Sequence, residues 1–324
     1  MEPLTSPPVP ATTTSPSRRI CRLLILILIV FILVGAATYA YRHYYTKVAA
    51  RVTTDSIRTV EGTFEDRSVY EYSLLGRKKV ALAVDGKLVT YDRSADAEAA
   101  IVAKDSDIQV VVPGNPMHVL ASGKGVKNAV AASPDGANVA YAELDEAVTQ
   151  NALASSTIYY NPSNWTIKIA TVASGEVRTL GKGYGPQFFS YEGRPYILYL
   201  TKEGVQIQSL DAKNVHLGIQ SDPIGSRPPR VSADGKHIAL YRSSAHMYKL
   251  YNMTIGNEGA ALTDVPSTIL VSTVAFKGER AIIASHIPQA GASNYRLYVY
   301  DFRADTIVAP FTGTTPMPVL KILP

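Results

Sequence analysis

A short motif that recurs along the chain constrains the fold more than any other feature of the sequence. Residues 133–141 read Ser-Pro-Asp-Gly-Ala-Asn-Val-Ala-Tyr, and residues 232–241 read Ser-Ala-Asp-Gly-Lys-His-Ile-Ala-Leu-Tyr. Asp before Gly is typical of a tight turn, because the carboxylate caps the turn backbone and Gly tolerates a positive φ. The motif therefore predicts a turn followed by a buried strand, and it gives Asp135 and Asp234 a structural role.

Weaker copies of the motif lie at 74–82, 189–199 and 275–284, so the five copies have their marker glycines at Gly76, Gly136, Gly193, Gly235 and Gly278. Successive glycines are 60, 57, 42 and 43 residues apart. The last two separations match the roughly 40–45 residues of a four-stranded propeller blade, and the first two exceed it by about one loop insertion.

Apolar and polar residues alternate after most of the markers, as half-buried strands require. A further hairpin is predicted at 80–92, around Asp85-Gly86. A blade cannot bury its own faces and must stack against its neighbours. The fold class is therefore all-β: a β-propeller of about five to six four-stranded blades, preceded by one transmembrane α-helix.

The number of blades follows from length. Residues 52–324 would fill about six blades of roughly 43 residues, although only five markers occur. Residues 53–72 could supply strands for a degenerate sixth blade, and 319–323 could be a closing strand. A five-bladed or incompletely closed ring is the alternative.

The copy at 133–141 resembles the repeat of TolB-like propellers, a WD-type family whose propellers also occur in prolyl-oligopeptidase-like enzymes. The copy at 232–241 is a near match, the others lose the Asp, and the resemblance covers roughly residues 70–310. It implies an extracytoplasmic envelope protein that acts by binding.

The N-terminal region has a different composition. Residues 1–19 form a Pro/Ser/Thr-rich tail that is expected to be disordered. No charge occurs between Arg22 and Arg42, and these 19 residues would span roughly 28 Å as a helix, close to a bilayer core. Residues 20–45 are therefore predicted to be a transmembrane anchor, and a signal peptide cleaved after Ala37 or Ala40 is the alternative. Residues 46–70 are interpreted as a linker or degenerate blade strands, and 71–324 as the propeller domain.

The charge is unevenly distributed. Residues 1–51 contain six Lys or Arg and one Glu, which leaves 26 basic and 26 acidic residues in the rest of the chain. A neutral body argues against a nucleic-acid partner, because phosphate binding requires a basic face. The basic flanks predict contact with a lipid bilayer through residues 20–45. The crowding of three arginines at 18–22 favours a cytoplasmic (plasma) membrane protein with its N-terminus inside and its C-terminal domain outside.

No catalytic, cofactor-binding or metal-ligating residues are predicted. The sequence has one Cys, no Gly-x-Ser-x-Gly motif and no pair of His residues at ligand spacing. The candidate ligand-binding residues are Tyr159, Tyr160 and Trp165, because aromatic residues on a loop often mark recognition. In the alternative interpretation, Trp165 begins a core strand.

The leading functional hypothesis is a non-catalytic scaffold for an unknown protein or polysaccharide partner. One alternative is a propeller hydrolase acting on envelope glycans, with two carboxylates about 5–10 Å apart across the central channel. The other alternative is a structural subunit of an envelope complex, which a large exposed apolar patch would favour.

Overall fold

The computed structural model describes residues 27–40, 57–62, 67–73, 76–82, 88–93, 98–102, 107–111, 118–121, 125–145, 148, 161–211, 216–219, 227–242, 245–256, 259–265, 271–289, 292–308 and 319–323. The chain divides into two compact units, Met1–Val52 and Thr53–Pro324. Within the first unit, residues 27–40 form an α-helix with exposed side chains. Among the described residues, no helix combines the length and the apolar character that a membrane span needs.

The second unit consists of six antiparallel sheets of four strands each, which are numbered here as blades 1 to 6. Blade 1 contains β24 (Val319–Leu323), β1 (Ile57–Gly62), β2 (Arg67–Ser73) and β3 (Gly76–Lys79). Blade 2 contains β4 (Leu88–Arg93), β5 (Glu98–Val102), β6 (Asp107–Val111) and β7 (His118–Ala121). Blade 3 contains β8 (Lys127–Ala132), β9 (Asn138–Leu144), β10 (Trp165–Thr171) and β11 (Val177–Lys182).

The remaining three blades follow the same order. Blade 4 contains β12 (Tyr184–Tyr191), β13 (Arg194–Thr201), β14 (Gly204–Ser209) and β15 (His216–Ile219). Blade 5 contains β16 (Arg230–Val231), β17 (His237–Arg242), β18 (Met247–Gly256) and β19 (Gly259–Asp264). Blade 6 contains β20 (Thr273–Phe276), β21 (Arg280–Gln289), β22 (Ala292–Asp301) and β23 (Thr306–Val308).

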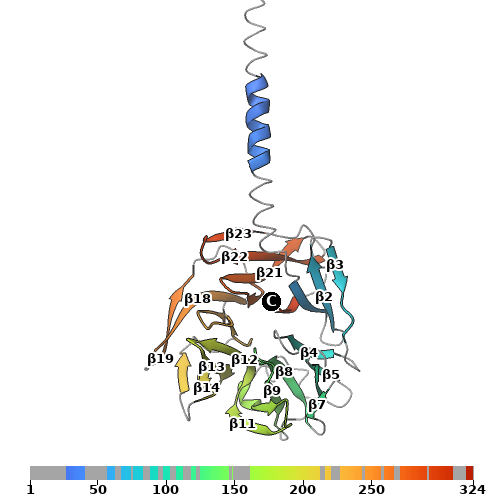
Figure 1. The fold of residues 1–324 in the computed structure, drawn as a ribbon, viewed down its shortest axis with the longest axis vertical. Helices are drawn as coiled ribbons and strands as arrows, with labels where there is room; N and C mark the ends of the chain where they lie inside the picture. Colours follow the sequence, from blue (N-terminus) through green and yellow to red (C-terminus); the bar gives the residue numbers. More distant parts are fainter. Residues whose placement is uncertain are drawn as a thin grey trace, which may run out of the picture. The chain divides into compact units, whose positions relative to one another are not determined.

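The six sheets surround a common centre, which Figure 1 shows in face view. The first strand of each sheet lies innermost, so that β24, β4, β8, β12, β16 and β20 surround the axis. The predicted all-β propeller is confirmed, and the number of blades is six. β1 and β2 belong to blade 1, so the stretch 53–72 supplies blade strands, which is one of the two interpretations of residues 46–70 given above.

The ring is closed by a strand from the far end of the domain. β24 pairs antiparallel with β1, with Arg58 opposite Leu323 and Val60 opposite Lys321. Blade 1 thus combines one strand from the C-terminal part of the domain with three from its N-terminal part, which confirms 319–323 as the closing strand.

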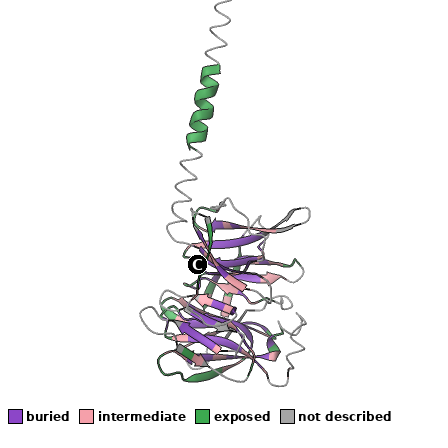
Figure 2. Cartoon of the chain, turned by 90° about the vertical axis from the view of Figure 1, so that its right-hand side faces the viewer, coloured by how far each residue is buried: buried purple, intermediate pink, exposed green. Residues whose placement is uncertain are grey.

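Apolar clusters between the blades form the core. Each cluster combines buried side chains of two neighbouring blades: Ile108 of blade 2 packs with Tyr141 of blade 3, for example, and Leu198 of blade 4 with Ile238 of blade 5. Figure 2 shows the buried residues running along the strands of each sheet. No blade completes its core alone, as the stacking of amphipathic sheets predicts.

Hydrogen bonds within the repeat motif confirm the structural role of its aspartates. Asp135 Oδ1 accepts from Ser133 Oγ at 2.5 Å and from the Ala137 amide at 3.0 Å. Asp234 Oδ1 accepts in the same way from Ser232 Oγ at 2.6 Å and from the Lys236 amide at 3.1 Å. The motif is therefore the turn between the first and second strands of blades 3 and 5.

Two predictions of local structure are wrong. Gly76 begins β3 and follows the third strand of its blade, whereas the other marker glycines lie between the first and second strands. The predicted hairpin at 80–92 is not formed: β3 pairs with β2, β4 pairs with β5, and residues 80–87 connect blade 1 to blade 2. Asp-Gly turn chemistry marks a reversal of the chain and does not specify which strands pair.

Candidate functional site

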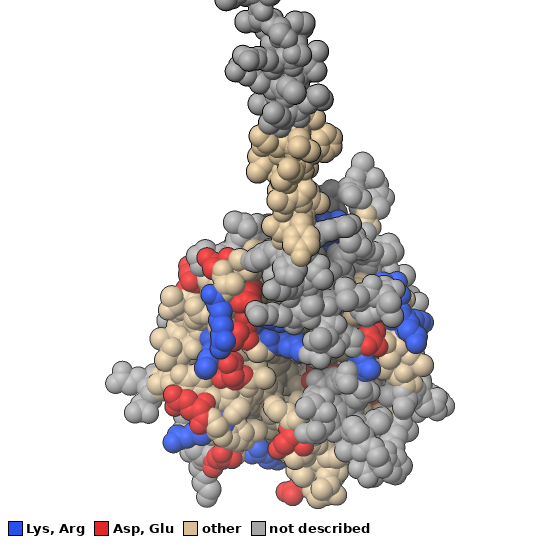
Figure 3. All heavy atoms as spheres, turned by 45° about the horizontal axis from the view of Figure 1, so that its top comes forward, with Lys and Arg blue, Asp and Glu red and all other residues tan. Residues whose placement is uncertain are grey.

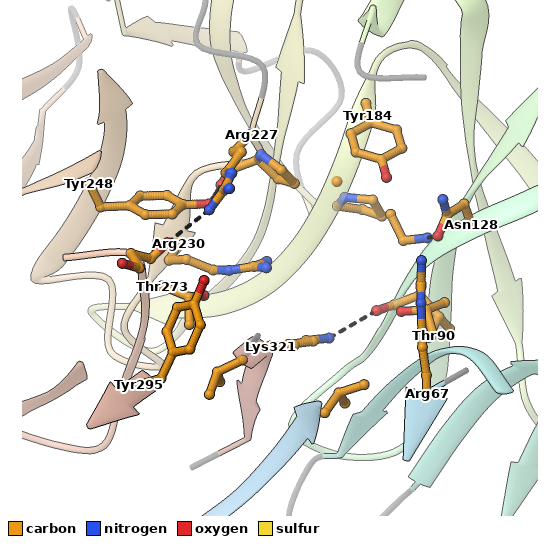
Figure 4. A pocket seen from close by; sticks show the side chains of 18 of the residues that line it. Arg67, Thr90, Asn128, Tyr184, Arg227, Arg230, Tyr248, Thr273, Tyr295 and Lys321 are labelled. Carbon is orange, nitrogen blue, oxygen red and sulfur yellow. Dashed lines mark hydrogen bonds between the residues drawn. The ribbon is translucent and has the colours of Figure 1, made fainter. Parts of the chain in front are cut away.

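A cavity of about 370 Å³ lies at the centre of the ring. All six blades contribute to its wall, mainly through their innermost strands and the segments that lead into them. Figure 4 shows the side chains of Arg67, Arg230 and Lys321 extending into this space from three sides. Because these residues lie on β2, β16 and β24, the site exists only in the closed ring.

Basic side chains dominate the charge of the cavity wall. Four of the lining residues are Lys or Arg (Arg67, Arg227, Arg230 and Lys321), and none of the lining residues that the structure describes is Asp or Glu. The face shown in Figure 3 differs, because its described Lys and Arg residues lie among Asp and Glu residues. A domain with balanced total charge therefore concentrates positive charge at its axis.

Lys321 is held by contacts with two other blades. Its Nζ lies 2.5 Å from Asp92 Oδ1 on β4 and 3.3 Å from the carbonyl oxygen of Val130 on β8. The second oxygen of Asp92 accepts the Ala132 amide at 2.8 Å. Burial lowers the pKa of Lys321, the charge of Arg230 lowers it further, and Asp92 opposes both effects. The pair joins blades 1, 2 and 3 at the cavity wall.

The opposite wall is fixed by hydrogen bonds around Pro228. Tyr248 donates its hydroxyl to the Pro228 carbonyl at 2.8 Å, and Arg227 Nη1 donates to the Ser272 carbonyl at 3.0 Å. Gly185 has φ +67°, and a Cβ at this position would lie 2.2 Å from Pro228 Cβ. The close approach of Gly185 and Pro228 therefore requires glycine at position 185.

Of the three residues predicted from sequence to bind a ligand, Trp165 is described, and it does not line this cavity. Trp165 begins β10, its side chain is fully buried, and its ring centroid lies 5.3 Å from that of Tyr184. Trp165 is thus a core residue, as in the alternative interpretation, and it offers no surface to a ligand. Tyr159 and Tyr160 lie outside the described residues.

The cavity residues could not be found from sequence. Arg67, Arg230 and Lys321 occur singly on strands of two blades, without a local motif. Their common feature is position near the axis, which depends on the register of each blade. The pairing of β24 with β1 brings together residues that are at opposite ends of the domain.

The described cavity wall lacks the carboxylate pair that the glycan hydrolase alternative requires. Within the part of the chain that the structure covers, no group of three His, Cys, Asp or Glu residues could hold a metal ion.

Comparisons with known proteins identify the fold. No family model matches the sequence, and no curated protein sequence matches it. TolB from Acinetobacter baumannii has a similar structure, with a TM-score of 0.54 and 18% identity over 78% of this chain and 62% of that chain. A protein from Agrobacterium tumefaciens assigned to TolB has a TM-score of 0.51 and 12% identity, over 81% of this chain and 91% of that chain. The present chain thus spans less than two thirds of the length of the Acinetobacter protein. With six four-stranded blades arranged as in these structures, the chain has a TolB-like β-propeller fold.

Proposed function

We propose that this protein is a membrane-anchored binding module that presents its propeller outside the cytoplasmic membrane. In this proposal, the propeller acts as a non-catalytic scaffold that takes part of a protein or polysaccharide partner into its central cavity. The observation that carries the proposal is the cavity itself. It is built by all six blades, and its walls are fixed by contacts between blades.

The anchor in this proposal is supported by the 19 uncharged residues between Arg22 and Arg42, with arginines at the N-terminal side. A proteolysis experiment on intact protoplasts tests the orientation. We expect added protease to remove a tag placed after residue 324 in intact protoplasts. Removal of the tag only after lysis would contradict the orientation.

The structural-subunit alternative receives no support from the described surface. The large hydrophobic residues exposed on the described part of the propeller are Val119 and Val177, which lie on different blades. Single exposed apolar residues of this kind are ordinary, whereas a permanent assembly interface presents a contiguous apolar patch.

Site-directed photo-crosslinking in cells of the source organism tests the binding role. His246 is exposed and lines the cavity, and Lys202 lies in an exposed turn between β13 and β14. With p-benzoyl-phenylalanine placed at position 246, we expect a discrete adduct that is absent when the same group is at position 202. The absence of an adduct at 246, or equal adducts at both positions, would contradict the proposal.

A further inference from the structure

We infer that the central cavity binds a compact polyanion, that is, a ligand group carrying at least two negative charges on phosphate or carboxylate oxygens. This inference rests on the proposed binding function and assigns the chemistry that the cavity recognises. The residues that carry it are Arg230 and Lys321, and Arg67 and Arg227 line the same space.

The first support is an imbalance of charge inside the cavity. Lys321 is paired with Asp92, and the other oxygen of Asp92 already accepts a backbone amide. Arg230 is partly buried and forms no ion pair with the part of the chain that the structure describes. Among the groups that the structure describes here, the carboxylate of Asp92 therefore accompanies at least two cations, and partly buried positive charge is unfavourable until an anion offsets it.

The second support is the mutual effect of the two cations. Burial is the main cause that lowers the pKa of Lys321, Asp92 acts in the opposite direction, and the charge of Arg230 contributes to the lowering. Both side chains extend into the cavity from different strands, β16 and β24 (Figure 4). An anion bound between them would interact favourably with both groups and reduce their repulsion. The repulsion between these two cations thus favours binding of a negatively charged ligand.

The size and the donors of the cavity define the ligand further. A volume of about 370 Å³ lies in the range of small-molecule sites, which is larger than a single inorganic ion requires. The planar guanidinium groups of Arg230 and Arg227 can each donate two parallel hydrogen bonds to carboxylate or phosphate oxygens. The hydroxyl groups of Thr90 and Thr273 also line the wall. These features fit a small molecule, or the end of a polymer, with two or more anionic groups.

Calorimetric titration of the full-length protein in mild detergent tests the inference. The probes are inorganic pyrophosphate and citrate, with sucrose as an uncharged control. We expect at least one anion to bind with one-to-one stoichiometry, and its affinity to fall as salt is raised. Stronger binding of pyrophosphate would identify phosphate chemistry, and stronger binding of citrate would identify carboxylate chemistry.

Matched variants show whether the cavity is the site. Arg230→Gln should weaken binding by at least about tenfold, because charge-assisted hydrogen bonds are lost. Lys202→Gln removes the same charge from the exposed turn and should change the affinity by less than about twofold. Arg227→Gln, at an exposed position of the cavity wall, should also weaken binding, and it serves if Arg230→Gln fails to fold.

Two results would overturn the inference: neither anion binds at about 10 mM, or Arg230→Gln and Lys202→Gln weaken binding equally. The crosslinking experiment remains independent of this outcome. An adduct at position 246 without anion binding would support the proposed binding function and would contradict the inference that the ligand is a polyanion.

Discussion

Replacing Ile322 by Ala tests whether the C-terminal strand stabilises the ring. Ile322 lies on β24 and is 3% exposed. It belongs to a cluster that joins Ile57 of blade 1 to Ile282 and Leu297 of blade 6. The substitution removes three buried carbon atoms at the junction where the ring closes. Loss of burial together with the resulting cavity should cost about 3 kcal/mol of the free energy of unfolding.

In a domain of this size, such a loss lowers Tm by roughly 6–12 °C. Thermal unfolding of the full-length protein, followed by circular dichroism in detergent, provides the measurement. Val177→Ala is the control, because Val177 is 42% exposed on β11 and should cost about 0.5 kcal/mol or less. Ile207→Ala, in the fully buried core between blades 4 and 5, should resemble Ile322→Ala. Equal Tm values for Ile322→Ala and Val177→Ala would show that residues 319–323 do not close the ring.

Three further predictions concern the turns and the buried charge. Gly235→Ala should destabilise the protein by about 1–3 kcal/mol more than Gly175→Ala, measured by urea unfolding. Both glycines have positive φ, so the backbone strain is similar. Only the new Cβ at position 235 would meet an aromatic ring, at 2.7 Å from Phe189 Cδ2. The Ser133 hydroxyl lowers the pKa of Asp135, so this contact stabilises the fold above pH 3.8, and the stabilisation is lost as the pH falls through the lowered pKa. Ser133→Ala should therefore cost about 1 kcal/mol at neutral pH and less at about pH 3, measured by thermal unfolding at both values. Glu61→Gln should cost about 3 kcal/mol in urea unfolding, because the 1%-exposed carboxylate binds an arginine at 2.6 Å and two hydroxyl groups.

Each of these predictions has a result that would contradict it. Equal losses for the two glycine variants would mean that the neighbouring aromatic ring moves aside at no cost. A loss for Ser133→Ala that does not change with pH would remove the carboxylate of Asp135 from the explanation. A neutral effect of Glu61→Gln would show that the buried hydrogen bonds, and not the charge, maintain blade 1.

The sequence contained enough information for the propeller fold but not for the pairing of every strand. The motif around Asp135 and Asp234 predicts its turn correctly, because Ser, Asp and Gly interact within a few residues. The predicted hairpin at 80–92 was wrong, because β3 pairs with β2 and β4 pairs with β5, and turn residues do not encode which of the nearby strands pair. Gly76 was assigned to the wrong turn of its blade, because the sequence preference for glycine in a tight turn does not depend on which strands that turn connects.

The residues of the candidate site could not be predicted from local sequence patterns for a related reason. Arg230 and Lys321 each look like an ordinary polar residue of an alternating strand. Their proximity follows from the circular arrangement, in which all six innermost strands face one axis. A cluster of aromatic residues can be recognised in a sequence, whereas the convergence of single cations from separate blades cannot.

The composite first blade also affects how the protein is made. On the ribosome, the strand Ile57–Gly62 is synthesised early, and its partner Val319–Leu323 emerges only after the other five blades. Until then, one edge of the nascent sheet has unpaired backbone groups and can pair with another chain. Translation that stops before Val319 would therefore release an unclosed set of blades. Its unpaired strand edge would be prone to aggregation.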